Sequence, residues 1–554
     1  MNRPLLFAAL VSFILFIPIA LYLRYFPQIG NVSFSDMIFI ALLAALFFSL
    51  VIGALYAERP RQLLLFTPQV LIMAVLVRAV PNMRLSYPAF HDPYYYMIVA
   101  NNIVDVGSLD PVMTYWYSGV DHQIPWPDMQ ILTTALHELG GIELMDLYMY
   151  QEPFLGVAFF LGVFLLGRYV LGEAKWAFIV AMIATFGDSV LFYQSEYHPQ
   201  GFGLIAFVFL LFLLVKKCDQ YRKEHYLVLG VVAAGFVFSH HFSTLLFVVL
   251  GIWTVAVFLI SWKVKWLHNV HTALKVNIVP WVIISMLILA YHLFVYPDQI
   301  VAFYNLFLKA SSGGGTFSGI FSSGANLVIS LAKVGGGIAL LIILIYSIRR
   351  RSHLEIRLAI PLLCMLIMVL AGFVIFLPTD RIIAFAYPIA AIVVILALRE
   401  LSGRFGSKKQ LRALIPAMMA FVIAATMVAT SINSQIPAYF LHDTQPNEAD
   451  FYKNTIIPMD KYVVAGEWFG DHTTNKTRYT ADFDAIMVPF YYAERSDALK
   501  YYPLQMAKKA FSNSFIFINP NYTYGSADGV RVSLDLTYQS MYDNGGIKIY
   551  RNTL

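Results

Sequence analysis

Long apolar runs follow one another along this chain, from its N-terminus to about residue 431. A helix needs about 20 apolar residues to cross roughly 30 Å of hydrocarbon, and it satisfies its own backbone hydrogen bonds there. Apolar residues make up 59% of the sequence and charged residues only 13%, which excludes an ordinary soluble domain. The runs predict a polytopic α-helical membrane protein with about 13 transmembrane helices, at residues 5–24, 36–57, 62–80, 153–171, 175–194, 200–216, 225–240, 242–261, 277–296, 326–348, 357–377, 382–399 and 411–431.

The positions of lysine and arginine predict how these helices are oriented, because basic residues are retained in the cytoplasm during insertion. The run after Met1 is interpreted as a retained anchor, since no small-x-small cleavage site follows it. With a cytoplasmic N-terminus, the basic residues of the outer loops are Arg24, Arg84, Lys309 and Arg381. Those of the inner loops are Arg59, Arg61, Lys175, Lys216, Lys217, Arg222, Lys223, Lys263, Lys265, Arg349, Arg350, Arg351, Arg357, Arg399, Arg404, Lys408, Lys409 and Arg412.

An odd number of spans divides the chain into a membrane domain, residues 1–431, and an extracytoplasmic domain, residues 432–554. The expected location is the plasma membrane, with many lipid contacts. The net charge of +5 follows from the attraction of the inner loops to an anionic leaflet, so no nucleic-acid partner is expected. The two cysteines, Cys218 and Cys364, offer no disulfide framework to the outer domain.

The outer domain is predicted to be a small α/β fold. Short apolar runs alternate in it with helix-like stretches, a pattern typical of strands and helices packed together. The segment Asp543-Asn544-Gly545-Gly546 is a turn signal before the last strand. The apolar runs are 462–465, 514–519, 530–534 and 547–550.

The longest outer insertion, residues 81–152, far exceeds the usual length of a connection, and such loops are usually functional. Proline and tryptophan beside its apolar stretches predict helices that lie in the membrane interface. His91 and Asp92 precede Pro93, close to the end of a span. Asp92 is therefore either a carboxylate of a site or the N-cap of a helix that begins at this Asp-Pro pair.

Two further outer segments carry ionisable side chains. Glu196 and His198 lie in a short turn before Pro199, and in an extended turn alternate side chains share one face. Ionisable groups at membrane depth are costly and usually functional, although solvated turn residues are the simpler alternative. His240 and His241 lie at another helix boundary, where adjacent helical positions point about 100° apart, so at most one is expected to face a cavity.

Arg381 begins a span at the outer surface. A guanidinium binds a phosphate through two parallel hydrogen bonds, which makes Arg381 a candidate for binding a lipid phosphate. Pairing with Asp380 or extension toward the interface are the alternatives. The outer loop 297–325 is rich in glycine and serine, so it is either a mobile loop that closes over a substrate or a flexible linker.

The motifs of the long loop, in order, are Asp92-Pro93-Tyr94-Tyr95, Gly107, Asp110-Pro111 and Trp126-Pro127. They resemble the first outer loop of GT-C membrane glycosyltransferases, especially the catalytic subunits of oligosaccharyltransferases. The resemblance implies that Asp92 is the first catalytic or metal-binding carboxylate. It also implies that Glu196-x-His198 stands where the family has two carboxylates, that Arg381 lies near a lipid phosphate, and that loop 297–325 is the family's mobile fifth outer loop.

The chain departs from that family in three respects. It has no Trp-Trp-Asp-Tyr-Gly motif, which reads the acceptor in oligosaccharyltransferases, and the segment Glu467-Trp468-Phe469-Gly470-Asp471 only superficially resembles one. Loop 297–325 contains no glutamate. Both departures argue against transfer to asparagine in peptides. Three spans precede the long loop, where the family generally has one, so two N-terminal spans are expected to be an addition.

These features predict a glycosyltransferase that moves a sugar or glycan from a polyprenyl-phosphate or polyprenyl-diphosphate carrier to a glycan, lipid or protein acceptor on the outer face. A transporter or flippase of a lipid-linked glycan is the alternative, but its charges would lie near the midplane; a non-catalytic receptor is another. The resemblance and the Asn-x-Ser/Thr patterns suggest an archaeal source. The candidate residues are Asp92 and Glu196 for catalysis, His91, His198, His240 and His241 for orienting an acceptor or metal, Arg381 for the lipid phosphate, and Asp92, Glu196 and His198 for an optional Mg²⁺ or Mn²⁺.

Overall fold

The structure is a computed structural model of the chain. Several predicted features lie outside the residues that it describes: loop 297–325, the span 326–348, His91 and Glu196. The described residues are 3–25, 34–79, 82, 88, 92–107, 115–117, 120–122, 127–195, 197–216, 223–275, 277–295, 353–372, 379–405, 420–421, 423, 459–473, 479–481, 515–518, 538–543 and 548–552.

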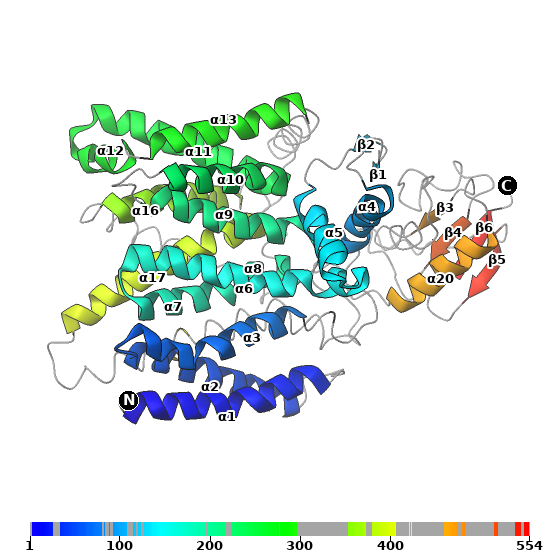
Figure 1. Cartoon of the computed structure of the whole chain (residues 1–554), viewed down its shortest axis with the longest axis horizontal. Helices are drawn as coiled ribbons and strands as arrows, with labels where there is room; N and C mark the ends of the chain where they lie inside the picture. The colour runs from blue at the N-terminus through cyan, green and yellow to red at the C-terminus, as the bar shows by residue number, and fades with distance from the viewer. Residues whose placement is uncertain are drawn as a thin grey trace.

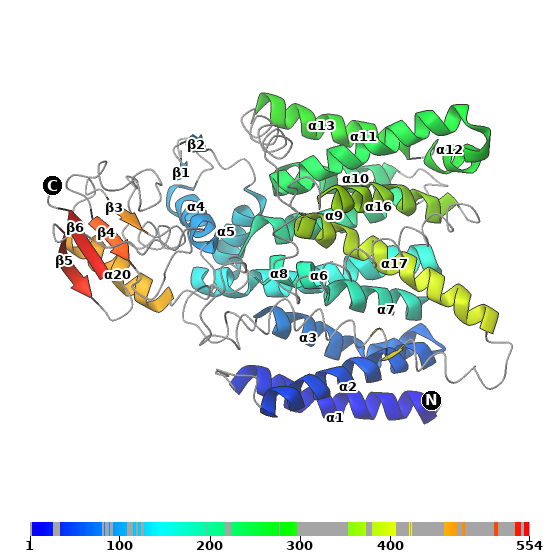
Figure 2. The same cartoon turned by 180° about the vertical axis from the view of Figure 1, so that it is seen from behind.

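Most of the described chain is a bundle of helices that lie roughly side by side, with α4, α5 and the C-terminal strands gathered at one end (Figures 1 and 2). The helices are α1 (Arg3–Tyr25), α2 (Phe34–Tyr56), η1 (Pro60–Leu65), α3 (Thr67–Ala79), α4 (Asp92–Val106), α5 (Asp128–Gly140), α6 (Leu144–Leu171), α7 (Ala174–Thr185), α8 (Asp188–Tyr193), α9 (Pro199–Val215), α10 (Lys223–Ser239), α11 (His241–Lys263), η3 (Lys265–Leu267), α12 (His268–Lys275), α13 (Ile278–Phe294), α16 (His353–Gly372), α17 (Thr379–Phe405) and α20 (Met459–His472).

Several of these helices have the length and apolarity of membrane spans. Among the described residues, Arg3–Leu21, Leu144–Leu171 and His241–Lys263 are each long enough to cross a bilayer alone. Helices α12 and α13, bent by 63° at the break between them, together pass the same test. The helical, apolar character predicted from the sequence is confirmed, whereas the count of 13 spans stays a prediction.

The predicted span 175–194 is not one continuous helix. Helix α7 ends at Thr185 and the short helix α8 begins at Asp188. Between them Gly187 lies against α17, and a Cβ atom built on it would be 2.8 Å from the ring of Tyr387. The break therefore comes from a close approach between segments that are distant in sequence, which the local apolar pattern does not contain.

Helix α6 lies in the middle of the bundle and packs against α3, α7 and α9. Small residues allow this close packing: a Cβ on Gly167 would lie 3.3 Å from the Cα of Ala177, and one on Gly162 would lie 3.2 Å from Val208. Membrane helices pack through such small residues because lipid supplies no hydrophobic driving force between them.

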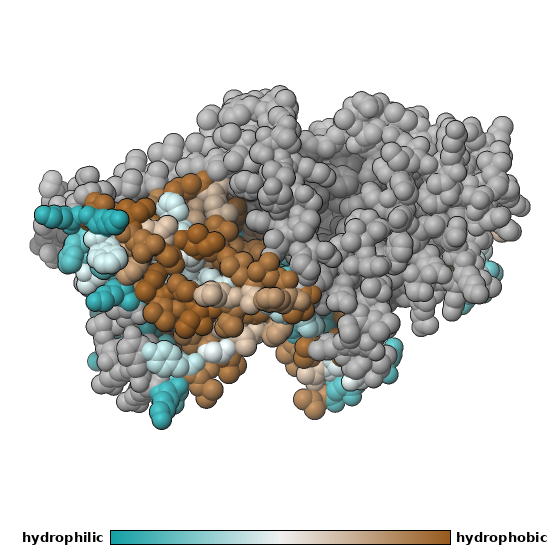
Figure 3. Space-filling model, turned by 90° about the horizontal axis from the view of Figure 1, so that it is seen from above, coloured by the Kyte–Doolittle hydropathy of each residue, from teal (hydrophilic) through white to brown (hydrophobic). Residues whose placement is uncertain are grey.

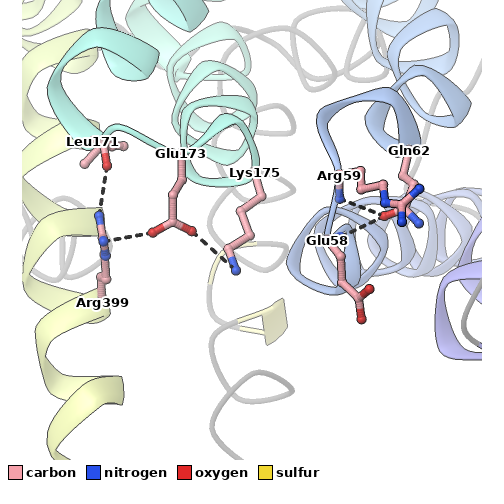
Figure 4. A network of polar contacts seen from close by, with 7 residues as sticks. All are labelled: Glu58, Arg59, Gln62, Leu171, Glu173, Lys175 and Arg399. Carbon is pink, nitrogen blue, oxygen red and sulfur yellow. Dashed lines mark hydrogen bonds and ion pairs between the residues drawn. The ribbon is translucent and has the colours of Figure 1, made fainter.

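The connections from α2 to η1, from α6 to α7 and from α11 to α12 lie at the end of the bundle opposite α4 and α5 (Figure 1). Figure 4 shows Glu173 between α6 and α7, paired with Arg399 of α17 at 2.8 Å and with Lys175 at 3.5 Å. Arg399 also donates to the carbonyl of Leu171 at 2.9 Å, one of the free carbonyls at the C-terminus of α6. A cation is favourable at a helix C-terminus, so this end is suited to basic side chains.

The C-terminal segment contains a four-stranded sheet in the order β3-β4-β6-β5, formed by β3 (Tyr479–Ala481), β4 (Phe515–Ile518), β5 (Tyr538–Asp543) and β6 (Lys548–Asn552). Strands β3 and β4 are parallel and the other neighbours are antiparallel. Strands β5 and β6 flank the predicted turn as a hairpin. The run 462–465 lies in helix α20 instead of a strand, because Val463, Gly466 and Phe469 are buried at the spacing of a helix. The run 530–534 lies outside the described residues.

The described residues of the long outer insertion include helices α4 and α5. A two-stranded hairpin, β1 (Tyr115–Tyr117) with β2 (Val120–His122), lies between them in the sequence. Helix α5 ends at Gly140, and Gly141 takes a left-handed conformation with φ of 63°, which glycine adopts without strain. Neither α4 nor α5 is long enough to cross a bilayer, as expected for helices in the interface.

Candidate functional site

Helix α4 begins at Asp92, so the predicted helix start at the Asp-Pro pair is confirmed. The side chain of Asp92 lies outside the described residues, and its role as N-cap or site carboxylate is not tested. Tyr96, one turn further along α4, is only 8% exposed. Its ring meets the imidazole of His198 edge-on, with ring centroids 5.3 Å apart. The first turn of α4 therefore lies against the turn that carries His198.

His198 is the N-cap of α9, followed by Pro199 at the first helical position. Its Nδ1 accepts a hydrogen bond from the backbone N–H of Gln200 at 3.0 Å. Capping satisfies one of the free N–H groups at the helix start and fixes the tautomer, with the proton on Nε2. Sequence reasoning expected an extended turn here, and His198 does have extended backbone angles, φ −145° and ψ 129°. Glu196 lies outside the described residues.

His198, His240 and His241 lie together although they come from two connections. The ring centroids of His198 and His240 are 5.4 Å apart, and those of His240 and His241 are 4.3 Å apart. The expectation that His240 and His241 diverge on one helix is wrong, because His240 is an extended N-cap residue between α10 and α11. Both imidazoles can therefore contribute to the same site.

Arg381 lies in the first turn of α17 and is partly buried. Its guanidinium carbon is 5.7 Å from the ring centroid of Phe242, a cation–π distance. The positive charge of Arg381 is near enough to His240 and His241 to disfavour a positive charge on either imidazole. The structure thus brings the predicted phosphate-binding arginine beside the paired histidines, while the side chain of Asp380 lies outside the described residues.

Two buried polar side chains beside the histidines have no hydrogen-bond partner among the described residues. They are the amide of Gln200, which is 0% exposed, and the hydroxyl of Ser243, also 0% exposed. Ser243 lies against α9, where a Cβ on Gly203 would be 2.5 Å from its Oγ and 3.4 Å from the Cβ of His240. Buried polar groups are almost always hydrogen-bonded, so these two are suited to contact a bound molecule.

A fourth histidine extends this group. The hydroxyl of Thr244 is 3.1 Å from the carbonyl of His240 and 2.9 Å from Nε2 of His292. His292 is 1% exposed and lies in α13. Sequence reasoning missed it, although a histidine near the end of an apolar run is itself a signal, because ionisable residues inside a membrane span are rare.

Arg78 is a second residue that sequence reasoning missed. It is 0% exposed in α3 and donates to Oε1 of Gln194 from Nε at 3.0 Å and from Nη2 at 2.8 Å. It also donates to the carbonyl of Thr185 at 2.7 Å. Gly156 of α6 makes room for it, since a Cβ there would lie 2.7 Å from the arginine Nε. Arg78 thereby fixes Gln194, two residues before Glu196.

Glu152 and Tyr197 continue this buried network on the other side of the turn. Glu152 is 1% exposed and attracts Arg78 electrostatically. The hydroxyl of Tyr197 lies 2.6 Å from that of Thr133 in α5, and burial raises the pKa of Tyr197 above its ordinary value. Asn82 donates to the carbonyl of Met149 at 2.7 Å. The turn between α8 and α9 is therefore held by side chains of α3 and α5.

Asp128, the first residue of α5, is a further carboxyl group near the site. Burial raises its pKa from 3.8 to about 7. Its Oδ2 lies 3.8 Å from where a Cβ on Gly235 would be, in the last turns of α10. A carboxyl group with a pKa near neutrality is suited to acid–base exchange. Asp128 directly follows the Trp126-Pro127 motif, but the sequence alone did not single it out.

The described residues do not form a group of three His, Cys, Asp or Glu side chains that could hold a metal ion. Two of the three predicted ligands, the side chains of Asp92 and Glu196, lie outside these residues. The third, His198, accepts a hydrogen bond at Nδ1, which leaves the ring proton on Nε2. A metal-ligating imidazole instead donates its other ring N–H to a partner, so His198 does not fit the predicted metal role while it caps α9.

Comparisons with known proteins find similarity in structure. No protein-family model and no curated protein sequence matches the chain. The crystal structure of ArnT from Cupriavidus metallidurans bound to undecaprenyl phosphate matches with a TM-score of 0.54 and 11% identity, over 88% of this chain and 98% of that one. The oligosaccharyltransferase of Archaeoglobus fulgidus, in complex with zinc and sulfate, matches with a TM-score of 0.51 and 15% identity, over 78% of this chain.

The chain covers only 62% of the length of that oligosaccharyltransferase. At identities of 11% and 15% the likeness concerns the fold. The chain is therefore similar in fold to ArnT and to this oligosaccharyltransferase.

Proposed function

We propose that this protein transfers a sugar or glycan from a polyprenyl-phosphate or polyprenyl-diphosphate carrier to an acceptor at the outer face of the plasma membrane. The observation that carries the proposal is the meeting of His198, His240, His241 and Arg381 at one end of the bundle. These residues come from three connections that are far apart in the sequence. They adjoin the first turn of α4, which begins at Asp92.

The leaving group of this reaction is the carrier phosphate, on which negative charge develops as the bond to the sugar breaks. Arg381 would bind the phosphate oxygens through its guanidinium, and His240 or His241 would add a donor from an imidazole N–H. Preorganised donors of this kind stabilise a transition state by several kcal/mol. Ser243 and Gln200, whose polar atoms have no partner among the described residues, would contact the phosphate or the sugar hydroxyls.

Asp92 would act as the general base. An acceptor oxygen attacks the anomeric carbon, its proton passes to the carboxylate of Asp92, and the bond between that carbon and the carrier phosphate breaks. Glu196 and His198 would orient the acceptor. A Mg²⁺ or Mn²⁺ ion, if bound, would supply positive charge at the phosphate and would be held by the carboxylates of Asp92 and Glu196. His198, the third predicted ligand, could join them only by giving up its capping hydrogen bond.

One structural neighbour supports a lipid-linked carrier, because ArnT was crystallised with undecaprenyl phosphate. The missing Trp-Trp-Asp-Tyr-Gly motif argues for an acceptor other than asparagine in a peptide. The C-terminal sheet and α20 would lie at the outer face beside the site, as they lie beside α4 and α5 at one end of the bundle (Figure 2).

The experiment is a transfer assay with purified protein, a radiolabelled polyprenyl-phosphate sugar and a panel of glycan, lipid and peptide acceptors. We expect label in an acceptor with the wild type, none with Asp92→Asn, and a rate reduced by at least about 10² with Arg381→Ala. Arg59→Gln, at the opposite end of the bundle, is the matched control and should transfer normally. Movement of labelled lipid across a vesicle without transfer would instead establish a flippase, and full transfer by Asp92→Asn would remove Asp92 as the base.

A further inference from the structure

Helix α12 differs from its neighbours because it is too short to span a membrane and lies at the end of the bundle opposite the site (Figure 1). It is bent by 63° from α13. Val270, Ala273 and Leu274 are buried and pack with Ile356 and Ile360 of α16 in a small separate core. Its other face is exposed, so α12 is amphipathic, and it packs against α11 and α16.

The exposed side of this segment is basic. Lys263 at the end of α11, Lys265 in η3 and Lys275 at the end of α12 are all exposed. The sequence has no Asp or Glu between Glu224 and Asp298, so nothing in the segment offsets these charges. Figure 3 shows hydrophilic residues at the edge of this face, next to a broad apolar surface.

A fourth lysine joins them from α9. Arg357 donates to the carbonyl of Ala273 in α12 at 2.9 Å and to that of Val215 in α9 at 3.3 Å. The guanidinium therefore connects the C-termini of the two helices. Lys216 follows Val215 directly and is exposed, so it lies at the same end of the bundle as α12. Its Nζ is 5.7 Å from the ring centroid of Phe212. Arg357 is 5% exposed and donates to these two carbonyls from Nε and Nη1, so it supports the surface without belonging to it.

An aromatic stack lies beside the lysines. The ring of His271 is stacked on Phe258 with centroids 4.5 Å apart and lies near Trp262 at 6.5 Å. Trp262 is 71% exposed, and exposed tryptophan is typical of the level of lipid headgroups. The stack fixes α12 against α11 at the depth where apolar surface changes to basic surface.

We infer that Lys216, Lys263, Lys265 and Lys275, with Trp262, form a binding surface for the headgroups of anionic phospholipids. Clusters of about four or more basic residues beside a membrane helix attract anionic lipids, and an amphipathic helix with a basic polar face lies in the interface plane. The surface is at the opposite end of the bundle from the histidines and Arg381, and the inference does not depend on the proposed catalytic activity.

The test uses the full chain in neutral detergent, titrated with phosphatidylglycerol that carries brominated acyl chains, which quench nearby tryptophan. The signal of Trp262 is obtained by subtracting the quenching seen with Trp262→Phe. The variant is Lys263→Gln/Lys265→Gln/Lys275→Gln. The matched control is Arg59→Gln/Arg61→Gln, which removes exposed basic charge beside Glu58 at the same end of the bundle.

Each lysine near an anionic surface is expected to change affinity roughly fivefold, so the triple variant should bind phosphatidylglycerol on the order of 100-fold more weakly at low salt. The affinity of the wild type for phosphatidylglycerol should fall between about 0.05 and about 0.5 M NaCl, because salt screens exposed charges. Brominated phosphatidylcholine should quench wild type and variant equally. Equal half-saturation of wild type and triple variant by phosphatidylglycerol, or an equal loss in the Arg59/Arg61 variant, would overturn the inference.

Discussion

Replacing Arg78 with methionine tests the buried network that holds the turn of the candidate site. Methionine fills a similar volume without charge, so the change removes mainly the polar contacts. Four hydrogen bonds are lost: two to Gln194, one to Thr185 and one to Ala74, at 2.7 to 3.0 Å. Removing one partner of a buried charged pair costs about 3–5 kcal/mol, because the other charge remains without compensation. Here that other charge is Glu152.

The magnitude is read from denaturant titrations of purified protein in mixed micelles, with the free energy extrapolated linearly to zero denaturant. We expect Arg78→Met to lower the free energy of unfolding by about 3–5 kcal/mol. Arg78→Met combined with Glu152→Gln should cost less than the sum of the two single changes, by about 0.5–3 kcal/mol. Additivity of the two changes, or a cost below about 1 kcal/mol for Arg78→Met, would refute the reasoning.

Three further changes test other parts of the structure. Asp128→Asn should raise the melting temperature relative to wild type at pH 8 and leave it unchanged below pH 4. Because the pKa of this carboxyl group is raised to about 7 in the folded protein, the wild type loses stability as the pH rises from about 4 to 7. A difference in melting temperature that does not change with pH would contradict this. Gly201→Ala should lower the free energy of unfolding by about 1–3 kcal/mol, since its Cβ would lie 2.5 Å from the carbonyl oxygen of Tyr193. Gly230→Ala, where a Cβ would meet open space, is the control and should not destabilise the protein. Equal effects of the two changes would count against the packing described. Arg381→Lys should bind polyprenyl phosphate about tenfold more weakly in a filter assay because lysine lacks the paired donors, and unchanged affinity would argue against bidentate contact.

Sequence reasoning predicted the features that depend on local pattern. Apolar length predicted the helical membrane architecture, and the Asp-Pro pair predicted a helix that begins at Asp92, as α4 does. The turn signal before residue 547 lies between β5 and β6. In each case the residues that determine the structure are neighbours in the sequence, so their spacing contains the information.

Features that depend on tertiary contacts were not predicted. Arg78 and Gln194 are 116 positions apart, and no local pattern connects a buried arginine in one span with a turn between two others. The break at Gly187 exists because Tyr387 lies against it. The pairing of His240 with His241 was misjudged, because sequence gave no sign that His240 would be an extended N-cap residue.

The candidate site was predicted from the sequence only in part. Composition and the positions of basic residues singled out His198, His240, His241 and Arg381 as candidates, and the structure brings these four together. The roles of Asp92, Glu196 and His91 stay predictions, since their side chains lie outside the described residues. Asp128, His292 and the polar atoms of Gln200 and Ser243 could be recognised only once burial was known.

The central claim is that the histidine and arginine group binds the phosphate of a polyprenyl carrier. A cryo-EM reconstruction of the protein with a polyprenyl phosphate tests it most directly. We expect a phosphate oxygen about 3 Å from the guanidinium of Arg381, a second one beside His240 or His241, and the polyprenyl chain between apolar helices. A phosphate bound at the opposite end of the bundle, or one that leaves Arg381 uncontacted, would contradict the account.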